Sequence, residues 1–350
     1  MRFLITGGAG FIGSALARHL VSQPKTNVLV VDKLTYAGRR ENLADVFGQD
    51  NFAFAEADIC NAADIRHALD MFRPNIVVHL AAESHVDRSI DAPHIFVMTN
   101  VSGTVTLLEE SLRYFRTLRD DDAEMFRFHH VSTDEVFGSL GPGGLFSETS
   151  PYDPRSPYSA SKASADHFVR AWHHTFGLPV VLSNCSNNYG PHQFPEKLIP
   201  LAMQNAIDRC PIPVYGDGRQ IRDWLYVDDH VRALCLVATR GQPGETYAIG
   251  GSSEKQNIDV VHAICALIDE LVPDDGPKRE TLIEHVVDRP GHDRRYAIDA
   301  SRMHGELGWT PQETFETGLR KTVRWYLDNR AWVEAIKATT YAGDRLGVAR

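Results

Sequence analysis

A short apolar segment, Arg2 to Thr6, runs directly into the glycine-rich string Gly7-Gly-Ala-Gly-Phe-Ile-Gly13. A strand, a glycine-rich turn and a helix in this order begin a dinucleotide-binding fold, because the glycines let backbone N–H groups approach a pyrophosphate at the helix N-terminus. The next apolar segment, Asn27 to Val31, ends in Asp32, which lies 19 residues after Gly13. A carboxylate at this distance accepts hydrogen bonds from ribose hydroxyls. The pattern therefore favours a bound dinucleotide over a tight turn without a ligand.

The acidic residue at the end of this second strand also bears on which dinucleotide binds. Asp32 would repel a 2′-phosphate, so it favours NAD over NADP. Lys33 beside it softens this preference. The sequence thus predicts NAD as the cofactor.

Apolar segments alternate with helical patterns through the first half of the chain. Strands are predicted at 52–56, 76–80, 126–131 and 179–184, and a helical pattern at about 95–118. Repeated β-α-β units produce a parallel sheet with helices on both faces. The sequence therefore predicts a Rossmann-type, doubly wound α/β fold, with ligand residues gathered where the strands end.

From about Asn187 the predicted elements become shorter and richer in proline and glycine, which favours a smaller C-terminal α/β domain that binds the substrate. The segment 221–240 is apolar enough to pack back on the first domain. We therefore predict an NAD-binding domain of residues 1–186 plus about 221–250, and a substrate domain of residues 187–220 plus about 251–340.

The strand predicted at 126–131 leads into Thr133-Asp134-Glu135. Two adjacent carboxylates can be solvated loop acids, or an acid and a base whose surroundings push their pKa values apart. Neighbours on a regular strand face opposite sides, so both can reach one substrate only from an irregular turn. The residues alone do not decide which of the two pKa values is raised.

Tyr158 and Lys162 are four residues apart, which places them on the same face of a helix. Ser156 is a suitable N-cap, Pro157 suits the first helical position, and Gly177 offers a stop. An ammonium beside a phenol favours the phenolate and lowers the tyrosine pKa from about 10. The Tyr158–Lys162 spacing alone is weak evidence for a catalytic pair, and the upstream carboxylates Asp134 and Glu135 strengthen it. Tyr158 is therefore a candidate base for a sugar or alcohol hydroxyl.

Several classes of function conflict with the composition. The net charge of -10 argues against nucleic acid or an anionic membrane as the main partner. No apolar run reaches the roughly 20 residues of a membrane span, and glycines follow the first strand too soon for a signal peptide.

The five cysteines are scattered without a C-x-x-C pair, which favours a reduced, cytoplasmic setting. No further ligands lie near His129-His130 or His173-His174, so no metal site is predicted.

These motifs resemble the extended short-chain dehydrogenase/reductase superfamily, and most closely its dTDP-glucose 4,6-dehydratases. Thr133-Asp134-Glu135 is the most specific part, because the epimerase relatives lack the Asp-Glu pair. Phe137, where tyrosine is common, and Gln193 depart from the pattern of the family without touching the catalytic set. The matching strings cover the chain from end to end: DKLTYAG (32–38), LAAESHVDRSI (80–90), STDEVFG (132–138), YSASKA (158–163), NCSNNYGP (184–191), FPEKLIP (194–200), YGDGRQIRDWLYVDDH (215–230) and DRPGHDRRY (288–296).

The resemblance implies a lyase that converts dTDP-glucose to dTDP-4-keto-6-deoxyglucose for deoxysugar biosynthesis. Tyr158 removes the proton of the C4 hydroxyl while a hydride passes to NAD, Lys162 keeps the tyrosine acidic, and Thr133 hydrogen-bonds the reacting hydroxyl. Glu135 then removes the C5 proton, and Asp134 protonates the departing C6 hydroxyl. Finally the hydride returns to C6.

The resemblance also implies binding residues and an assembly. The implied cofactor residues are Gly7, Gly10, Phe11, Ile12, Gly13, Asp32, Lys33, Leu34, Thr35, Asp58, Ile59, Leu80, Ala81, Ala82, Glu83, Thr99, Tyr158, Lys162 and Asn188. The implied substrate residues are Ser84, Thr133, Asn187, Lys197, Leu198, Pro213, Val214, Tyr215, Arg222, Asn257, Asp288, Arg289, Pro290, Gly291 and His292. A homodimer is expected through two long helices at about 97–117 and 157–176.

Two other interpretations stay open at this point. The nearer one is another nucleotide-sugar enzyme, such as a GDP-mannose or UDP-sugar 4,6-dehydratase or a C4 epimerase, and Asp134 with Glu135 argues against the epimerase. The farther one is a non-catalytic NAD sensor, which would need neither Tyr158 nor the acidic pair. The motifs leave open whether the deoxysugar feeds a cell-surface polymer or a secondary metabolite, and how tightly NAD is retained.

Overall fold

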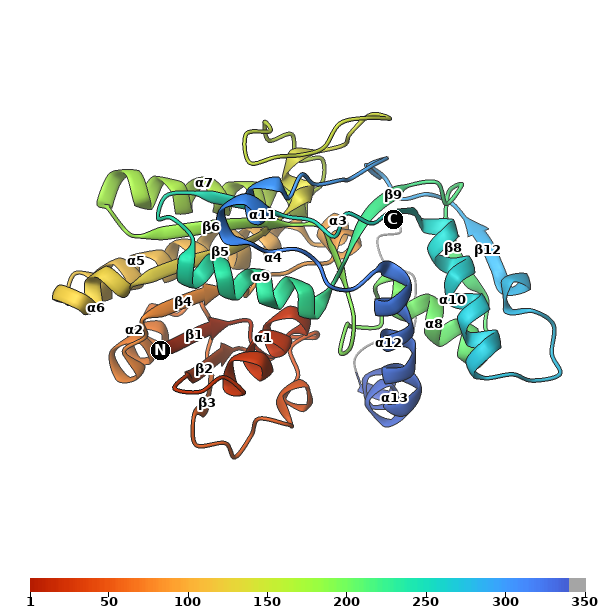
Figure 1. Cartoon of the computed structure of the whole chain (residues 1–350), viewed down its shortest axis with the longest axis horizontal. Helices are drawn as coiled ribbons and strands as arrows, with labels where there is room; N and C mark the ends of the chain where they lie inside the picture. Colours follow the sequence, from red (N-terminus) through yellow and green to blue (C-terminus); the bar gives the residue numbers. More distant parts are fainter. Residues whose placement is uncertain (340–350) are drawn as a thin grey trace.

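The computed structural model describes residues 1–339, and its larger part is built on one seven-stranded sheet (Figure 1). The strand order is β10-β6-β5-β4-β1-β2-β3, and all pairings are parallel. The Rossmann-type, doubly wound sheet predicted from the sequence is thereby confirmed. The strands are β1 (Arg2–Thr6), β2 (Asn27–Asp32), β3 (Phe52–Glu56), β4 (Ile76–His79), β5 (Arg127–Thr133), β6 (Val180–Cys185) and β10 (Thr246–Ile249).

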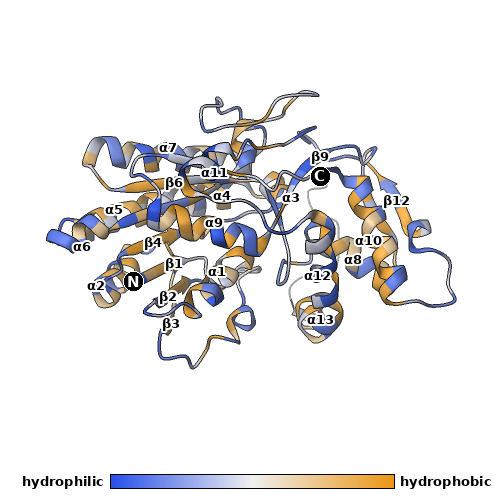
Figure 2. Cartoon of the chain, viewed as in Figure 1, coloured by the Kyte–Doolittle hydropathy of each residue, from blue (hydrophilic) through white to orange (hydrophobic). Residues whose placement is uncertain are grey.

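Helices cover both faces of this sheet, because successive strand residues point to opposite sides. Phe3 and Ile5 of β1 belong to one buried cluster and Leu4 to another. The first cluster packs under α1 (Phe11–Val21), α9 (Val227–Arg240) and α11 (Ser301–Leu307). The second packs under α2 (Ala62–Phe72), α5 (Thr104–Phe115) and α7 (Pro157–Phe176). Figure 2 shows the matching pattern, with hydrophobic colour along the central strands and mixed colour on the covering helices.

The smaller part lies beyond one end of the sheet and has its own apolar core (Figure 1). One small sheet has the order β11-β9-β7, and β8 pairs with β12 in another. The strands are β7 (Asn187–Tyr189), β8 (Ile212–Tyr215), β9 (Ile221–Tyr226), β11 (Glu254–Gln256) and β12 (Ile283–Val286). The helices are α8 (Leu198–Asp208), α10 (Asn257–Leu271), η4 (Arg279–Leu282), α12 (Phe315–Asp328) and α13 (Arg330–Thr339).

The chain crosses between the two parts more than once. β9 belongs to the smaller part, and α9 follows it directly and packs on the large sheet, as the apolar character of 221–240 predicts. β10 then adds the last strand to the large sheet beside β6. The domain boundaries stay a prediction, and residue 340 of the predicted second domain lies outside the described residues.

One segment of the first half differs from its predicted form. The pattern at 95–118 predicts one helix, whereas the structure has α4 (Pro93–Phe96), the π-helical η2 (Val97–Gly103) and then α5. Gly103 lies against Ile59, where an added Cβ would come within 2.7 Å of the Ile59 Cδ1 atom, so close packing accompanies the wider turn. The acidic run 120–122 begins the short exposed helix α6 (Asp120–Met125).

The remaining short elements connect the large sheet to its helices. They are η1 (Arg40–Leu43), α3 (Val86–Asp91) and η3 (Asp134–Phe137). Within residues 1–339 no helix is both long enough and apolar enough to cross a bilayer.

Candidate active site

A cleft opens at the carboxyl ends of β1, β4, β5 and β6, beside the point where the strand order reverses between β1 and β4. This is the usual ligand position in an open α/β sheet. Most of the cofactor residues predicted from the sequence line it. They are Gly7, Gly10, Phe11, Ile12, Gly13, Asp32, Lys33, Thr35, Ile59, Leu80, Ala81, Ala82, Glu83, Thr99, Tyr158, Lys162 and Asn188. Leu34 and Asp58 lie just outside its wall and contact Asp32 and Lys33.

The glycine-rich turn between β1 and α1 is shaped by close backbone approaches. Gly7 has a φ of +70°, and an added Cβ there would come within 2.6 Å of the Ala81 Cα atom. A Cβ on Gly13 would come within 2.3 Å of the Gly7 carbonyl oxygen. Gly10 is the N-cap of α1 and makes no side-chain cap hydrogen bond. The first N–H groups of α1 therefore stay available to an anion at the bottom of the cleft, which fits a dinucleotide.

Asp32 is held at the end of β2 by two backbone donors. Its Oδ2 accepts from Ala9 N at 2.9 Å and its Oδ1 accepts from Leu34 N at 2.8 Å. Burial raises the pKa of Asp32, and these two hydrogen bonds oppose that shift. Lys33 points to Asp58, with 3.4 Å between Nζ and Oδ2. The Lys33 ammonium is already paired with Asp58, and the fixed Asp32 carboxylate would repel a phosphate. Asp32 therefore suits a free ribose hydroxyl better than a 2′-phosphate.

The acidic pair lies in η3, the 3-10 turn that follows β5. An irregular turn at this point is the arrangement that the sequence predicts, and the structure confirms it. Thr133 caps the turn by accepting from Glu135 N at 3.3 Å, and its hydroxyl lies 3.3 Å from Asp134 Oδ1. Asp134 is buried, and its Oδ2 atom has no hydrogen-bond partner among the described residues.

The two carboxyl groups have different neighbours. Burial raises the pKa of Asp134 well above its ordinary value, and the nearby carboxylates of Glu135 and Asp223 raise it further. Burial also raises the pKa of Glu135, but the positive charges of Arg289, Lys197 and Arg222 oppose this. Burial and two neighbouring carboxylates thus favour the neutral form of Asp134, whereas the rise at Glu135 is opposed by three neighbouring cations.

Helix α7 begins and ends where the sequence predicts. Ser156 is its N-cap in a capping box with Ser159, and Gly177 is its left-handed C-cap, with φ 72°. Tyr158 and Lys162 are both buried and both line the cleft. The α7 helix therefore presents this pair to the same space as Asp134 and Glu135.

The expected effect of Lys162 on Tyr158 is not seen in the protein alone. Burial raises the pKa of Tyr158 well above 10, the charge of Glu135 adds to this shift, and a hydrogen bond with Thr133 only partly opposes it. The Lys162 ammonium donates to the Val131 carbonyl oxygen at 2.9 Å. The prediction of a lowered tyrosine pKa is therefore wrong for this structure, because burial and the charge of Glu135 outweigh the hydrogen bond with Thr133.

The predicted substrate residues fall into two groups. Ser84, Thr133, Asn187 and Lys197 line the cleft. Arg222 and Arg289 lie behind them and interact electrostatically with Glu135. Outside the cleft wall are also Leu198, Pro213, Val214, Tyr215, Asn257, Asp288, Pro290, Gly291 and His292.

One ion pair and one hydrogen bond connect this second group to α3 of the larger part. Asp87 of α3 accepts from Arg289 Nη1 at 3.0 Å and from the Tyr215 hydroxyl at 3.0 Å. Asp288 contacts His292 Nδ1 at 2.6 Å and accepts from Gln220 at 2.8 Å. Lys197 Nζ donates to the Ser84 carbonyl oxygen at 2.9 Å. These contacts place Arg289 and Lys197, from distant parts of the chain, where both favour the charged form of Glu135.

One cluster on the cleft wall was missed by the sequence analysis. Glu196 accepts from Arg88 Nε at 2.9 Å and from the Tyr36 hydroxyl at 3.0 Å, and the Arg88 guanidinium lies 3.9 Å from the centre of the Tyr36 ring. Arg88 and Glu196 are 108 residues apart, so no local pattern connects them. The cluster fastens the loop before α8 to the cofactor side of the cleft.

Known proteins resemble this chain along nearly its whole length. Residues 4–322 match the family described as GDP-mannose 4,6 dehydratase. A probable dTDP-glucose 4,6-dehydratase of Sinorhizobium fredii is 59% identical over 348 residues, which cover 99% of each chain. The dTDP-glucose 4,6-dehydratase of Shigella flexneri is 57% identical over 350 residues, which cover 97% of each chain. The crystal structure of the dTDP-glucose 4,6-dehydratase DesIV of Streptomyces venezuelae contains NAD; it has a TM-score of 0.87 and 45% identity, covering 96% of this chain and 100% of that one.

Proposed function

The chain belongs to the family of NAD-dependent dTDP-glucose 4,6-dehydratases, and from this premise we propose that it converts dTDP-glucose to dTDP-4-keto-6-deoxyglucose by the residues described above. The observation that carries the proposal is that two adjacent acids line the cleft from one irregular turn, the pKa of Asp134 raised well above its ordinary value and the rise at Glu135 opposed by three cations. Elimination of water needs one protonated and one ionised group at the same sugar. Neither an epimerase nor an NAD sensor needs this pair.

NAD fits the cleft on the side of the glycine-rich turn. The N-terminus of α1 is suited to the pyrophosphate, Asp32 to a ribose of the adenosine half, and Lys162 to the nicotinamide ribose. When bound, NAD supplies a hydride acceptor and the positive charge of its nicotinamide ring. Tyr158, which is neutral in the protein alone, is ionised more readily beside added positive charge.

The first proton transfer is assigned to Tyr158. It takes the proton of the C4 hydroxyl, and Thr133 hydrogen-bonds the same oxygen. Lys162, one helical turn away, stabilises the phenolate by its charge. With the C4 hydrogen lost as a hydride, which bound NAD would accept, C4 becomes a ketone, and its carbonyl makes the neighbouring C5 proton acidic.

The elimination is assigned to the acidic pair. Glu135 removes the C5 proton because its ionised form is supported by Lys197, Arg222 and Arg289. Asp134 protonates the departing C6 hydroxyl because its surroundings keep it protonated, and its Oδ2 atom is free for the substrate. Water leaves across C5 and C6, C6 then gains the hydride, and a proton returns to C5.

The diphosphate of the substrate is assigned to the cations of the smaller part. Arg222 is buried, donates to the Asp293 carbonyl oxygen at 3.0 Å and lies 4.2 Å from the centre of the Tyr296 ring, so its guanidinium is fixed in place. A fixed guanidinium can bind a phosphate through two donors. We assign the remaining predicted substrate residues to the same nucleotide diphosphate.

We propose a cytoplasmic homodimer as the working form. Apolar side chains are exposed along α4, η2 and α7, where the sequence predicts the dimer helices. They are Ile95, Val97, Met98, Phe168 and Phe176. Burial of such a patch against a second copy would remove it from water. The five cysteines are all free, which suits a reducing compartment.

The function is tested by incubating the purified protein, without added cofactor, with dTDP-glucose, UDP-glucose or GDP-mannose and measuring the sugar by mass spectrometry. We expect the loss of one water from dTDP-glucose, which would also demonstrate retained NAD. Loss from another nucleotide sugar would keep the mechanism and change the substrate. If no donor loses water even after NAD is added, the dehydratase proposal is wrong and the sensor is favoured.

A further inference from the structure

A line of polar residues continues along α7 below the catalytic pair. Tyr158, Lys162, Asp166 and Arg170 follow one another at four-residue spacing, so they lie on one face of the helix. Tyr158 and Lys162 line the cleft. Asp166 does not, and its side chain is completely buried. Burial of a charged carboxylate is unfavourable unless the carboxylate is paired, so Asp166 must have partners that compensate its charge.

Asp166 has polar neighbours on three sides. Its Oδ2 accepts from the Ser132 hydroxyl at 2.8 Å and from the Tyr152 hydroxyl at 2.7 Å. Its Oδ1 lies 3.1 Å from His130 Nε2. Arg170, one turn further along α7, donates to the Tyr152 hydroxyl at 2.8 Å. Burial alone raises the pKa of Asp166, yet the neighbouring His130, Lys162 and Tyr152 outweigh it and lower the pKa.

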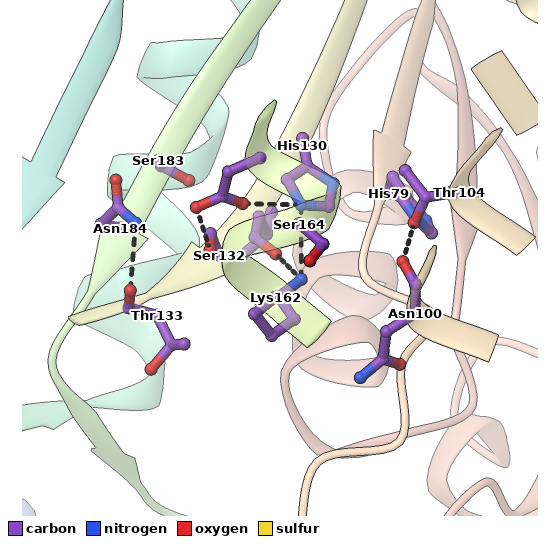
Figure 3. Close-up of polar contacts among 12 residues, drawn as sticks. His79, Asn100, Thr104, His130, Ser132, Thr133, Lys162, Ser164, Ser183 and Asn184 are labelled. Atoms are coloured by element: carbon purple, nitrogen blue, oxygen red, sulfur yellow. Dashed lines mark hydrogen bonds and ion pairs between the residues drawn. The ribbon is translucent and has the colours of Figure 1, made fainter. Parts of the chain in front are cut away.

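His130 connects this carboxylate to the catalytic lysine. Figure 3 shows Lys162 pointing to His130 on the neighbouring strand, with 3.4 Å between Lys162 Nζ and His130 Nε2. Burial and the charge of Lys162 lower the pKa of His130 to about 4, so the ring is neutral at pH 7. His130 Nε2 lies between the two charged groups, 3.4 Å from the Lys162 ammonium and 3.1 Å from Asp166 Oδ1. The histidine therefore fixes the carboxylate close to the ammonium without adding a positive charge.

We propose that Asp166 is a positioning residue for the reaction: directly by its charge, and through His130, it keeps the Lys162 ammonium charged and in place one helical turn below Tyr158. This inference rests on the proposed role of Tyr158 as base. Lys162 has only one other close partner, the Val131 carbonyl oxygen, among the described hydrogen bonds. A carbonyl holds the ammonium in position but does not compensate its charge.

The charged groups around the pair set the expected direction of the effect. Burial lowers the pKa of Lys162, and the charge of Asp166 opposes this. Without that charge Lys162 loses its proton more readily, and the phenol of Tyr158 then ionises only at a higher pH. The other titratable groups that face the pair from the surrounding elements are His79, His130, Asp134, Glu135, Tyr152, Arg170 and Cys185.

The test is the pH dependence of kcat with dTDP-glucose for Asp166→Asn, which keeps the shape of the side chain and removes the charge. We expect the acidic limb of the profile to move up by about one pH unit, which is about a tenfold lower kcat at a pH on that limb, with recovery at higher pH. KM should not change, because Asp166 does not line the cleft.

Asp229→Asn is the matched control. Asp229 is also completely buried and also holds other groups in place, accepting from Gln312 N and Glu313 N at 3.1 and 3.0 Å, but it lies on α9. This variant should lose stability and keep the pH profile of the parent. A purely structural role for Asp166 predicts the same result for Asp166→Asn.

A folded Asp166→Asn protein with an unshifted profile, or with activity lost equally at every pH, would overturn the proposal. If Asp166→Asn does not fold, Asp166→Ser decides, because it removes the same charge with a smaller polar side chain; the same upward shift supports the proposal and no shift rejects it. Tyr158→Phe separates this inference from the proposed function. If Tyr158→Phe stays fully active, the base assignment itself is wrong, whereas an inactive Tyr158→Phe with an unshifted Asp166→Asn profile rejects only the role of Asp166.

Discussion

The two sides of the cleft are built in different ways. The side of the glycine-rich turn is formed by residues close in sequence, and its shape depends on backbone contacts such as the 2.3 Å that would separate a Gly13 Cβ from the Gly7 oxygen. The acid–base side is formed by side chains from distant elements, such as Arg289 and Asp87, which are 202 residues apart. One side is therefore fixed by local geometry and the other by charges that meet only in the folded chain.

The largest expected effect concerns the acid–base side. Glu135→Gln keeps the size of the side chain and removes the ionised oxygen, so turnover should fall by about 10²- to 10⁴-fold, the usual contribution of a positioned base. Affinity for the nucleotide should change little, because the cations that surround Glu135 remain. Steady-state kinetics together with calorimetric binding of dTDP measures both. Unchanged turnover would remove the base assignment.

The next effect concerns the glycine-rich turn. Gly13→Ala forces a Cβ against the Gly7 backbone, and overpacking of this kind costs about 1–3 kcal/mol of stability. The purified protein should also retain less NAD, which absorbance after denaturation measures. Gly143→Ala is the control, because no atom lies within 4 Å of the added Cβ. Equal stability and NAD content in both variants would show that the turn is not fixed by backbone contacts.

A third effect tests the charges around Asp134 through stability. The folded-state pKa of Asp134 is raised above its unfolded value, so its contribution to stability is present at low pH and is lost as pH rises toward the folded pKa. As pH rises through this window, the free energy of unfolding of Asp134→Asn should therefore increase relative to that of the parent protein by at most about 1.4 kcal/mol per pH unit. Denaturant unfolding at a series of pH values measures this gain. A constant difference would mean that Asp134 is ionised in the folded protein.

The smallest effect is expected at Lys33. Its contact with Asp58 is a partly exposed ion pair, and such pairs contribute about 0–1 kcal/mol. Lys33→Ala should barely change the free energy of unfolding but should weaken any residual binding of NADP relative to NAD. Thermal unfolding with each dinucleotide compares the two. Stronger stabilisation by NADP in the variant would contradict the assignment of Asp32.

The contrast between the two sides also explains which features the sequence could predict. Gly7 to Gly13, Asp32 and the cap of α7 at Ser156 were predictable because each is a local pattern with a local physical cause. The π-helical turn at Val97–Gly103 was not, because it accompanies the packing of Gly103 on Ile59. Nor were the neighbours of Asp134 and Glu135, since Asp223, Arg222 and Arg289 reach them through the fold. Asp166 could have been found, because it continues the spacing of Tyr158 and Lys162 by one more turn.

The position of β10 in the large sheet has a consequence for the synthesis of the protein. The ribosome makes β1 to β6 first, then the chain that forms β7, α8, β8, β9 and α9, and only then Thr246–Ile249. Until that strand emerges, β6 is an open edge whose backbone groups can pair with another chain. The nascent protein therefore passes through a stage at which aggregation competes with completion of the sheet, and rapid folding of the intervening segment shortens that stage.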